Sequence, residues 1–310
     1  MIPGPSALLV TTRALQLMSS LLPVGVFAFA LYGDGQPTGS RRVQRSLLLI
    51  CALLALGSGL LWLSLVAGRI YGAAGSVDPQ MRHWLAILHA TRFGQVWQWR
   101  FLLLLVWLPV ALWYEHACRR RGLVVIGVAA STTGLASLAW IGHAGASGSI
   151  LCLVADIAHL LAAGVWIGGL LPLYLLLRGV ESTLGIEHAR RTTRRFSIVG
   201  LICVGSLLVS GIVNASPLGW QLWDWTHSQY GRLLLYKLGL FGVLLVIAAR
   251  NRLCLTPALL STQPLEAAGS LRRAIVAELV FAAAIIAVVG ALGASMPPQH
   301  AQAGLSQHIA

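Results

Sequence analysis

The feature that most constrains this chain is a series of long apolar runs that contain no charged residue. Residues 46–68 and 196–223 are two such runs, and each exceeds the roughly 20 residues that a helix needs to cross the hydrocarbon core of a bilayer. Charged residues make up only 10% of the sequence, whereas about 25% is usual in a soluble domain. The chain therefore has too little polar surface for a water-soluble globule, and an all-α polytopic membrane protein is predicted.

Eight membrane-spanning helices are expected, because backbone amides in lipid must find their hydrogen-bond partners within their own segment. We place them at residues 11–32, 46–68, 95–114, 122–142, 150–177, 196–215, 230–249 and 273–294. Residues 1–310 are treated as one transmembrane domain that ends in a mobile periplasmic tail, 295–310.

The basic residues cluster between alternate spans and so predict the orientation. The clusters are SRRVQR (40–45), EHACRRR (115–121), ARRTTRR (189–195), ARNR (249–252) and LRR (271–273). Under the positive-inside rule these segments are cytoplasmic, and both termini are then periplasmic. The net charge of +13 therefore reflects orientation signals and does not indicate a nucleic-acid partner.

The fifth span carries two ionisable residues inside an otherwise apolar stretch. Asp156 and His159 are three residues apart, so they share a helix face, and Trp166 lies close to the same stripe. Gly164 and Gly168 form a small-residue surface that lets another helix approach closely. The pair is therefore expected to face the bundle. It is either a metal or proton site, or a hydrogen-bonded clamp between two helices.

Two segments share a short frame that suggests an internal half-repeat. TRFGQVWQWR (91–100) and SQYGRLLLYK (228–237) both have a hydroxyl residue, an aromatic–glycine pair and a basic residue at matching positions. Repeats of this kind are common in transporters. Arg100 and Lys237 end the two frames inside spanning helices. Either both reach the headgroups, or one of them pairs with Asp156.

Further candidate metal ligands gather on the predicted periplasmic side. His143 precedes the fifth span in a Gly/Ser loop, and DPQMRHWLAILHA (78–90) reads as a surface helix with Met81, His83 and His89. His83 and His89 do not share a helix face and are not expected to chelate one ion by themselves. The predicted set of metal ligands is His159, Asp156, His143, His83, His89 and Met81. Imidazole suits copper, zinc, iron and nickel, whereas thioether selects Cu(I).

Other features support no further chemistry. The five cysteines are scattered without a CxxC pair, which argues against a disulfide framework or a thiolate metal cage. Nucleotide-binding and hydrolase motifs are absent from the sequence, so no enzymatic activity is expected. Glu278 is interpreted as an interfacial side chain near the inner end of the eighth span, with a proton or ion exit role as the alternative.

Several segments together resemble one known family. GHA (142–144), DIAHLLAAGVWIGGLLPL (156–173), RRFSIVGLICVGSLLVSGIVNA (194–215) and YGRLLLYKLGLFGVLLVIAARNRLCLTPAL (230–259) are similar to the copper resistance protein D (CopD) family. His143, Asp156, His159 and Trp166 fall on the pattern of that family. The resemblance implies an eight-span protein of the bacterial inner membrane. It would receive copper, as Cu(I) or Cu(II), from a periplasmic protein of the CopC type and pass it toward the cytoplasm.

Two other functions remain open from the sequence. Intramembrane histidines on facing helices can ligate haem, so a haem-binding or redox protein that acts on periplasmic copper is one alternative, with haem as its cofactor. A docking platform for periplasmic copper chaperones, without transport of its own, is the other.

Overall fold

The computed structural model describes residues 7–33, 37–71, 80–142, 145, 148–180, 183–216, 226–260 and 263–295, and for residues 70, 71, 80–83, 183 and 184 it describes the backbone alone. Within these residues the chain is helical and contains no strand. The helices are α1 (Ala7–Tyr32), α2 (Thr38–Tyr71), α3 (Gln80–Ala90), α4 (Arg92–Leu112), α5 (Tyr114–Ala117), α6 (Arg121–Ala136), α8 (Ile150–Arg178), α9 (Thr183–Ala215), α11 (Gln229–Arg250), α12 (Thr256–Ala258) and α13 (Pro264–Ala294). A 3-10 helix, η2 (Ser137–Ile141), continues α6, and a π-helix, η4 (Asn251–Leu255), joins α11 to α12.

Eight helices in the described part of the chain are long and apolar enough to cross a membrane. They correspond one to one with the eight predicted spans, so the all-α membrane bundle is confirmed. The short helix predicted within 78–90 is also present, as α3. Residues 78 and 79, which were predicted to begin it, lie outside the described part.

Three helices begin well before the predicted membrane spans that they contain. α2, α9 and α13 begin at residues 38, 183 and 264, whereas the sequence placed the spans at 46, 196 and 273. The basic clusters at these places are helical rather than looped. Arginine is a good helix former, and its long side chain reaches polar surroundings from a helix end. The helices therefore continue beyond the apolar length of each span.

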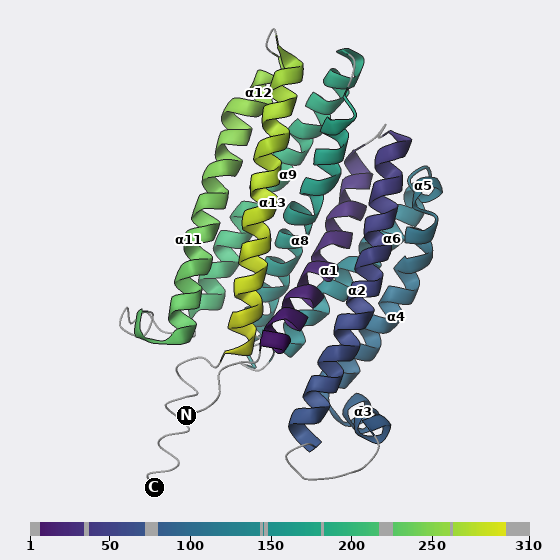
Figure 1. The fold of residues 1–310 in the computed structure, drawn as a ribbon, viewed down its shortest axis with the longest axis vertical. Coiled ribbons are helices and arrows are strands. Elements are labelled where there is room, and N and C mark those ends of the chain that lie inside the picture. Colours follow the sequence, from purple (N-terminus) through teal and green to yellow (C-terminus); the bar gives the residue numbers. More distant parts are fainter. Residues whose placement is uncertain are drawn as a thin grey trace.

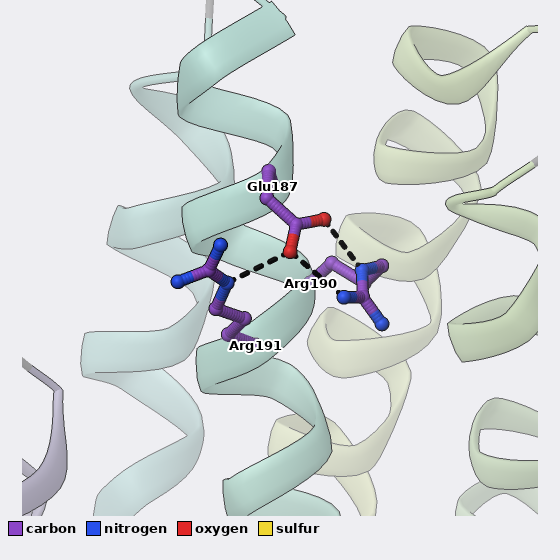
Figure 2. Close-up of polar contacts among 3 residues, drawn as sticks. All are labelled: Glu187, Arg190 and Arg191. Carbon is purple, nitrogen blue, oxygen red and sulfur yellow. Dashed lines mark hydrogen bonds and ion pairs between the residues drawn. The ribbon is translucent and has the colours of Figure 1, made fainter.

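The first turns of α9 show how such a basic helix end is stabilised. Glu187 accepts hydrogen bonds from Arg190 Nε and Arg191 Nε, each at 2.7 Å (Figure 2). Pairs three and four residues apart are neighbours on a helix surface. One carboxylate serves two guanidinium groups, so this end of α9 keeps a net positive charge.

The bundle has two chemically distinct ends (Figure 1). α1 begins and α13 finishes at one end, which we call the outer end. The basic clusters of α2, α5, α9 and α13 lie at the opposite, inner end. This separation is the pattern on which the predicted orientation depends.

The helices form two groups of four with the same pairing order. In the first group α1 packs on α2 and α6, and α4 packs on α6. In the second group α8 packs on α9 and α13, and α11 packs on α13. One pairing differs between the two groups. α2 packs on α4, whereas the corresponding helices α9 and α11 have no extensive contact among the described residues.

The two groups meet along α1 and α8, the most extensively paired helices of the bundle. A methyl group added to Gly25 would lie 2.1 Å from the backbone carbonyl carbon of Gly168. Both positions therefore require glycine, and the small-residue surface predicted on the fifth span is in close contact with α1. This contact fixes α8 at the centre of the molecule.

The two sequence frames also begin alike in three dimensions. Thr91 and Ser228 are the N-caps of α4 and α11, and their hydroxyl oxygens accept from the backbone N–H of Gly94 at 3.0 Å and of Gly231 at 2.9 Å. Hydroxyl side chains at this position satisfy an N–H group that has no partner within the helix. The frame is therefore a capping signal that recurs at the third helix of each group.

Candidate functional site

The candidate site is built on the outer half of α8. Ser149 caps this helix by accepting from Cys152 N, and the following leucine- and alanine-rich residues keep it helical without interruption. Asp156 and His159 lie within its second and third turns and are half-buried. The predicted inward orientation is supported by their partners, which come from the neighbouring helices α9 and α11.

His159 is oriented by a hydroxyl group on α9. Its Nδ1 lies 3.0 Å from Ser210 Oγ, and Ser210 Oγ in turn donates to the backbone oxygen of Ser206 at 2.6 Å. A hydroxyl group that donates its single proton to a carbonyl oxygen accepts from Nδ1–H of the imidazole, and this is the tautomer that we consider. The neutral ring then carries its lone pair on Nε2. Such second-shell bonds commonly fix the tautomer of a metal-binding histidine.

Lys237 on α11 is the cation that faces the pair. It lies within electrostatic reach of both Asp156 and His159. An ionised carboxylate among apolar helices requires a countercharge, and Lys237 supplies a positive charge for Asp156. Of the two basic residues predicted as partners of Asp156, Lys237 is therefore the one whose charge acts on it.

Arg100, the other basic residue, has separate partners in the first group of helices. Its guanidinium donates to the backbone oxygen of Gly134 at 2.5 Å, to Ser137 Oγ at 3.3 Å and to Ser20 Oγ at 2.8 Å. It ties α4 to α6, η2 and α1. Arg100 is thus not the basic residue that faces Asp156, and its partners are hydroxyl and carbonyl oxygens inside the bundle.

Asn214 is a functional candidate that the sequence reading missed. It lies on α9 four residues beyond Ser210, on the same helix face, and its Oδ1 is buried with no hydrogen-bond partner among the described residues. α8 and α9 run in opposite directions, so the contact of His159 with Ser210 places the turn of Asp156 opposite the turn of Asn214. A buried acceptor without a partner suggests a ligand. The signal was a polar stripe in an apolar helix: Ser206, Ser210 and Asn214.

The remaining predicted ligands are not brought to this pair by the described residues. His89 is exposed on α3, which packs on α2 and α4 (Figure 1). Met81 and His83 lie in the first turns of α3, but the structure describes only their backbone. His143 lies outside the described part. No group of three His, Cys, Asp or Glu side chains placed to hold a metal occurs among the described residues.

Further along α8, Trp166 lies at the wall of a cavity. The indole is 3% exposed and packs beside Gly200 of α9. The cavity below it, toward the inner end, has a volume of about 310 Å³ and is lined by α8, α9, α11, η4, α12 and α13. It lies between α9 and α11, which have no extensive contact with each other among the described residues. Trp166 thus separates the Asp156–His159 level from a second polar region.

Glu278 belongs to that second region, and its predicted interfacial position is wrong. The side chain is only 3% exposed, lines the cavity and accepts a short hydrogen bond from the amide nitrogen of Asn251. Asn251 is the first residue of the π-helix η4. Sequence reading assigned Asn251 to a basic cytoplasmic loop, so it did not anticipate a partner that holds Glu278 inside the bundle.

Comparison with known proteins gives consistent results. The family described as Copper resistance protein D matches residues 190–292, and the family described as Copper resistance protein D-like, N-terminal domain, matches residues 3–153. Copper resistance protein D of Pseudomonas syringae pv. tomato is 30% identical over 290 residues, which cover 89% of this chain and 93% of that protein. Inner membrane protein YebZ of Escherichia coli is 31% identical over 75% of this chain and 80% of its own length.

A third relative matches over a shorter stretch. Copper transport protein CutJ of Bacillus subtilis is 39% identical over 101 residues, which are 31% of this chain and 18% of that protein. No solved structure gives a significant match. The whole-chain match and the eight spans agree with each other. This is a multi-pass protein of the inner membrane, and it belongs to the copper resistance protein D family.

Proposed function

We propose that the protein transports copper across the inner membrane and is not an enzyme. Copper would enter at the outer end, occupy the level of Asp156 and His159, and leave toward the cytoplasm. The proposal is supported by family membership and by an ionisable pair held inside the bundle. Ionisable side chains at this depth are costly, and they commonly mark the paths of ions or protons.

The observation that carries the proposal is the orientation of His159. Its Nδ1 is bound to Ser210. In the tautomer that donates from Nδ1, the lone pair of Nε2 would serve a metal, and imidazole nitrogen is a good copper ligand. Asp156 and the unpartnered Oδ1 of Asn214 supply oxygen donors at the next turn. These residues fit a transient copper site whose other ligands come with the ion or from the outer segments.

Lys237 would balance the charge of this site when no copper is bound. Without copper, its ammonium group supplies the countercharge of Asp156. Copper bound to Asp156 and His159 would take over that role and repel Lys237. The carboxylate of Asp156 would therefore have a countercharge whether the site is empty or loaded, which limits the cost of that negative charge inside the membrane.

Copper would be delivered by a periplasmic copper-binding protein of the CopC type. The support for this partner is the family assignment together with the exposed His89 on α3 at the outer end (Figure 1). Delivery can be tested by measuring copper flux into sealed vesicles with and without such a protein. A flux that is unchanged by the donor protein at limiting free copper would argue against this partner.

The experiment that tests transport is copper accumulation by cells that express His159→Ala. The variant should lose copper uptake while it is still inserted in the membrane at normal levels, because it lacks the metal-binding nitrogen. His116→Ala is the matched control, since His116 is exposed on α5 at the inner end. Normal uptake by His159→Ala, or an equal loss in His116→Ala, would contradict the proposal.

A further inference from the structure

The cavity below Trp166 holds a second cluster of polar groups that the copper path does not use. Glu278, Asn251 and Thr193 line it, and their side chains are 3%, 7% and 3% exposed. The three residues come from α13, η4 and α9. Buried polar side chains need partners for their polar atoms, and three of them around one space suggest a ligand site.

Two of these side chains have an atom without a partner. Asn251 Oδ1 and Thr193 Oγ1 are buried and form no hydrogen bond with the described residues. The Asn251 amide nitrogen is bound to Glu278 Oε1, so the acceptor Oδ1 remains beside the carboxyl group. An unsatisfied acceptor next to a carboxylate calls for a donor or a positive charge.

The backbone holds Asn251 in this position. η4 is a π-helix, and the Thr256 hydroxyl group donates to the backbone oxygen of Asn251 at 2.8 Å. A π-turn interrupts the regular helical face, and such turns occur often at functional sites. The neighbouring Arg252 points to α9, where it donates to the Ser197 backbone oxygen and hydroxyl group, both at 2.8 Å.

Charge decides what kind of ligand the cavity would take. Glu278 and Arg252 are the charged groups of its described wall, and no ion pair joins them among the described residues, because Arg252 is bound to Ser197. A carboxylate in these apolar surroundings is stabilised by a cation. A divalent ion would leave a large excess of positive charge beside Arg252, so a monovalent ion is favoured.

We propose that this cavity binds a hard monovalent cation, such as Na⁺, through oxygen ligands from Glu278 and Asn251, with Thr193 contributing from across the cavity. The described wall contains no His, Cys or Met, so it does not suit Cu(I), for which soft donors are selective. The volume of about 310 Å³ leaves room for the ion to keep several waters. The bundle would thus have separate binding sites for copper and for a second ion.

Cation binding is measured on the purified full-length protein in detergent, without copper. The unfolding midpoint is recorded by tryptophan fluorescence while NaCl replaces choline chloride at constant ionic strength. A ligand that binds only the folded state raises the midpoint in a saturable way. The wild type should show this rise, Glu278→Gln should lose it, and Thr193→Val should need a higher Na⁺ concentration for the same rise.

Glu266→Gln is the matched control, because Glu266 is an exposed carboxylate in the first turn of the same helix. It should respond to Na⁺ like the wild type. The proposal is overturned by an equal Na⁺ response in Glu278→Gln, or by an equal effect of choline. A response to pH alone would also overturn it, because it would mean that Glu278 binds only a proton. None of these measurements involves copper, so they are independent of the proposed transport.

Discussion

The contact between α1 and α8 leads to a prediction with a calculable size. In Gly25→Ala, the new methyl carbon would lie 2.1 Å from Gly168 C and 2.2 Å from Gly169 N. Carbon atoms pack at about 3.5–4.0 Å, so the helices must separate by about 1.5 Å or more. Backbone atoms cannot turn aside as a flexible side chain can, and the whole helix pair must move.

The cost of this separation can be estimated from packing. Overpacking a well-packed site usually costs about 1–3 kcal/mol, and a gap of 0.5–1 Å removes about a quarter to a half of each dispersion contact. We expect Gly25→Ala to lower the free energy of unfolding by about 3 kcal/mol, at the top of that range. Gly168→Ala should cost less, because its nearest atom, Leu21 O, is 2.8 Å away.

The assay is unfolding of the purified variants in mixed detergent micelles with increasing SDS. Gly57→Ala is the control, because a methyl group there meets nothing within 4 Å, and alanine is favoured over glycine in a helix by about 0.5–1 kcal/mol. Gly57→Ala should be the most stable of the three variants, Gly168→Ala should be less stable, and Gly25→Ala should be the least stable. If Gly25→Ala were as stable as Gly57→Ala, the close α1–α8 contact would be refuted.

Two further predictions concern the site on α8. Ser210→Ala should reduce copper affinity, measured by uptake at limiting copper, by about 10–100-fold, because His159 loses the group that orients it; unchanged uptake would remove Ser210 from the site. Asp156→Asn should destabilise the protein by up to about 3 kcal/mol, because it leaves Lys237 without its countercharge. The double variant Asp156→Asn/Lys237→Met should be more stable than Asp156→Asn alone in the same SDS titration. If its change in stability equalled the sum of the changes in the two single variants, the two residues would not interact.

The sequence was sufficient for the parts of the fold that depend on one helix at a time. Span length and the absence of charge identified all eight crossing helices, and glycine spacing on the fifth span indicated a close helix contact. The shared position of Asp156 and His159 followed from helical periodicity. The limits of the helices were less accurate, because arginines after an apolar run can continue a helix as well as end it, as at 183–195.

Partners on other helices were harder to predict. Ser210, Asn214 and Asn251 are ordinary residues in the sequence, and their importance depends on which helix faces them. Lys237 and Arg100 occupy matching positions in the two frames, yet only tertiary packing brings Lys237 to Asp156. A period of four in Ser206, Ser210 and Asn214 was the available signal for a polar face on α9.

The two helices with matching N-caps, α4 and α11, carry basic residues in different surroundings. In one copy the guanidinium of Arg100 is held by three oxygens of its neighbours, so this charge already has its partners. In the other copy the ammonium of Lys237 acts on Asp156 and His159, for which copper would compete under the proposed function. With two similar groups of four helices, the first group would maintain the fold while the ions bound in the second group change.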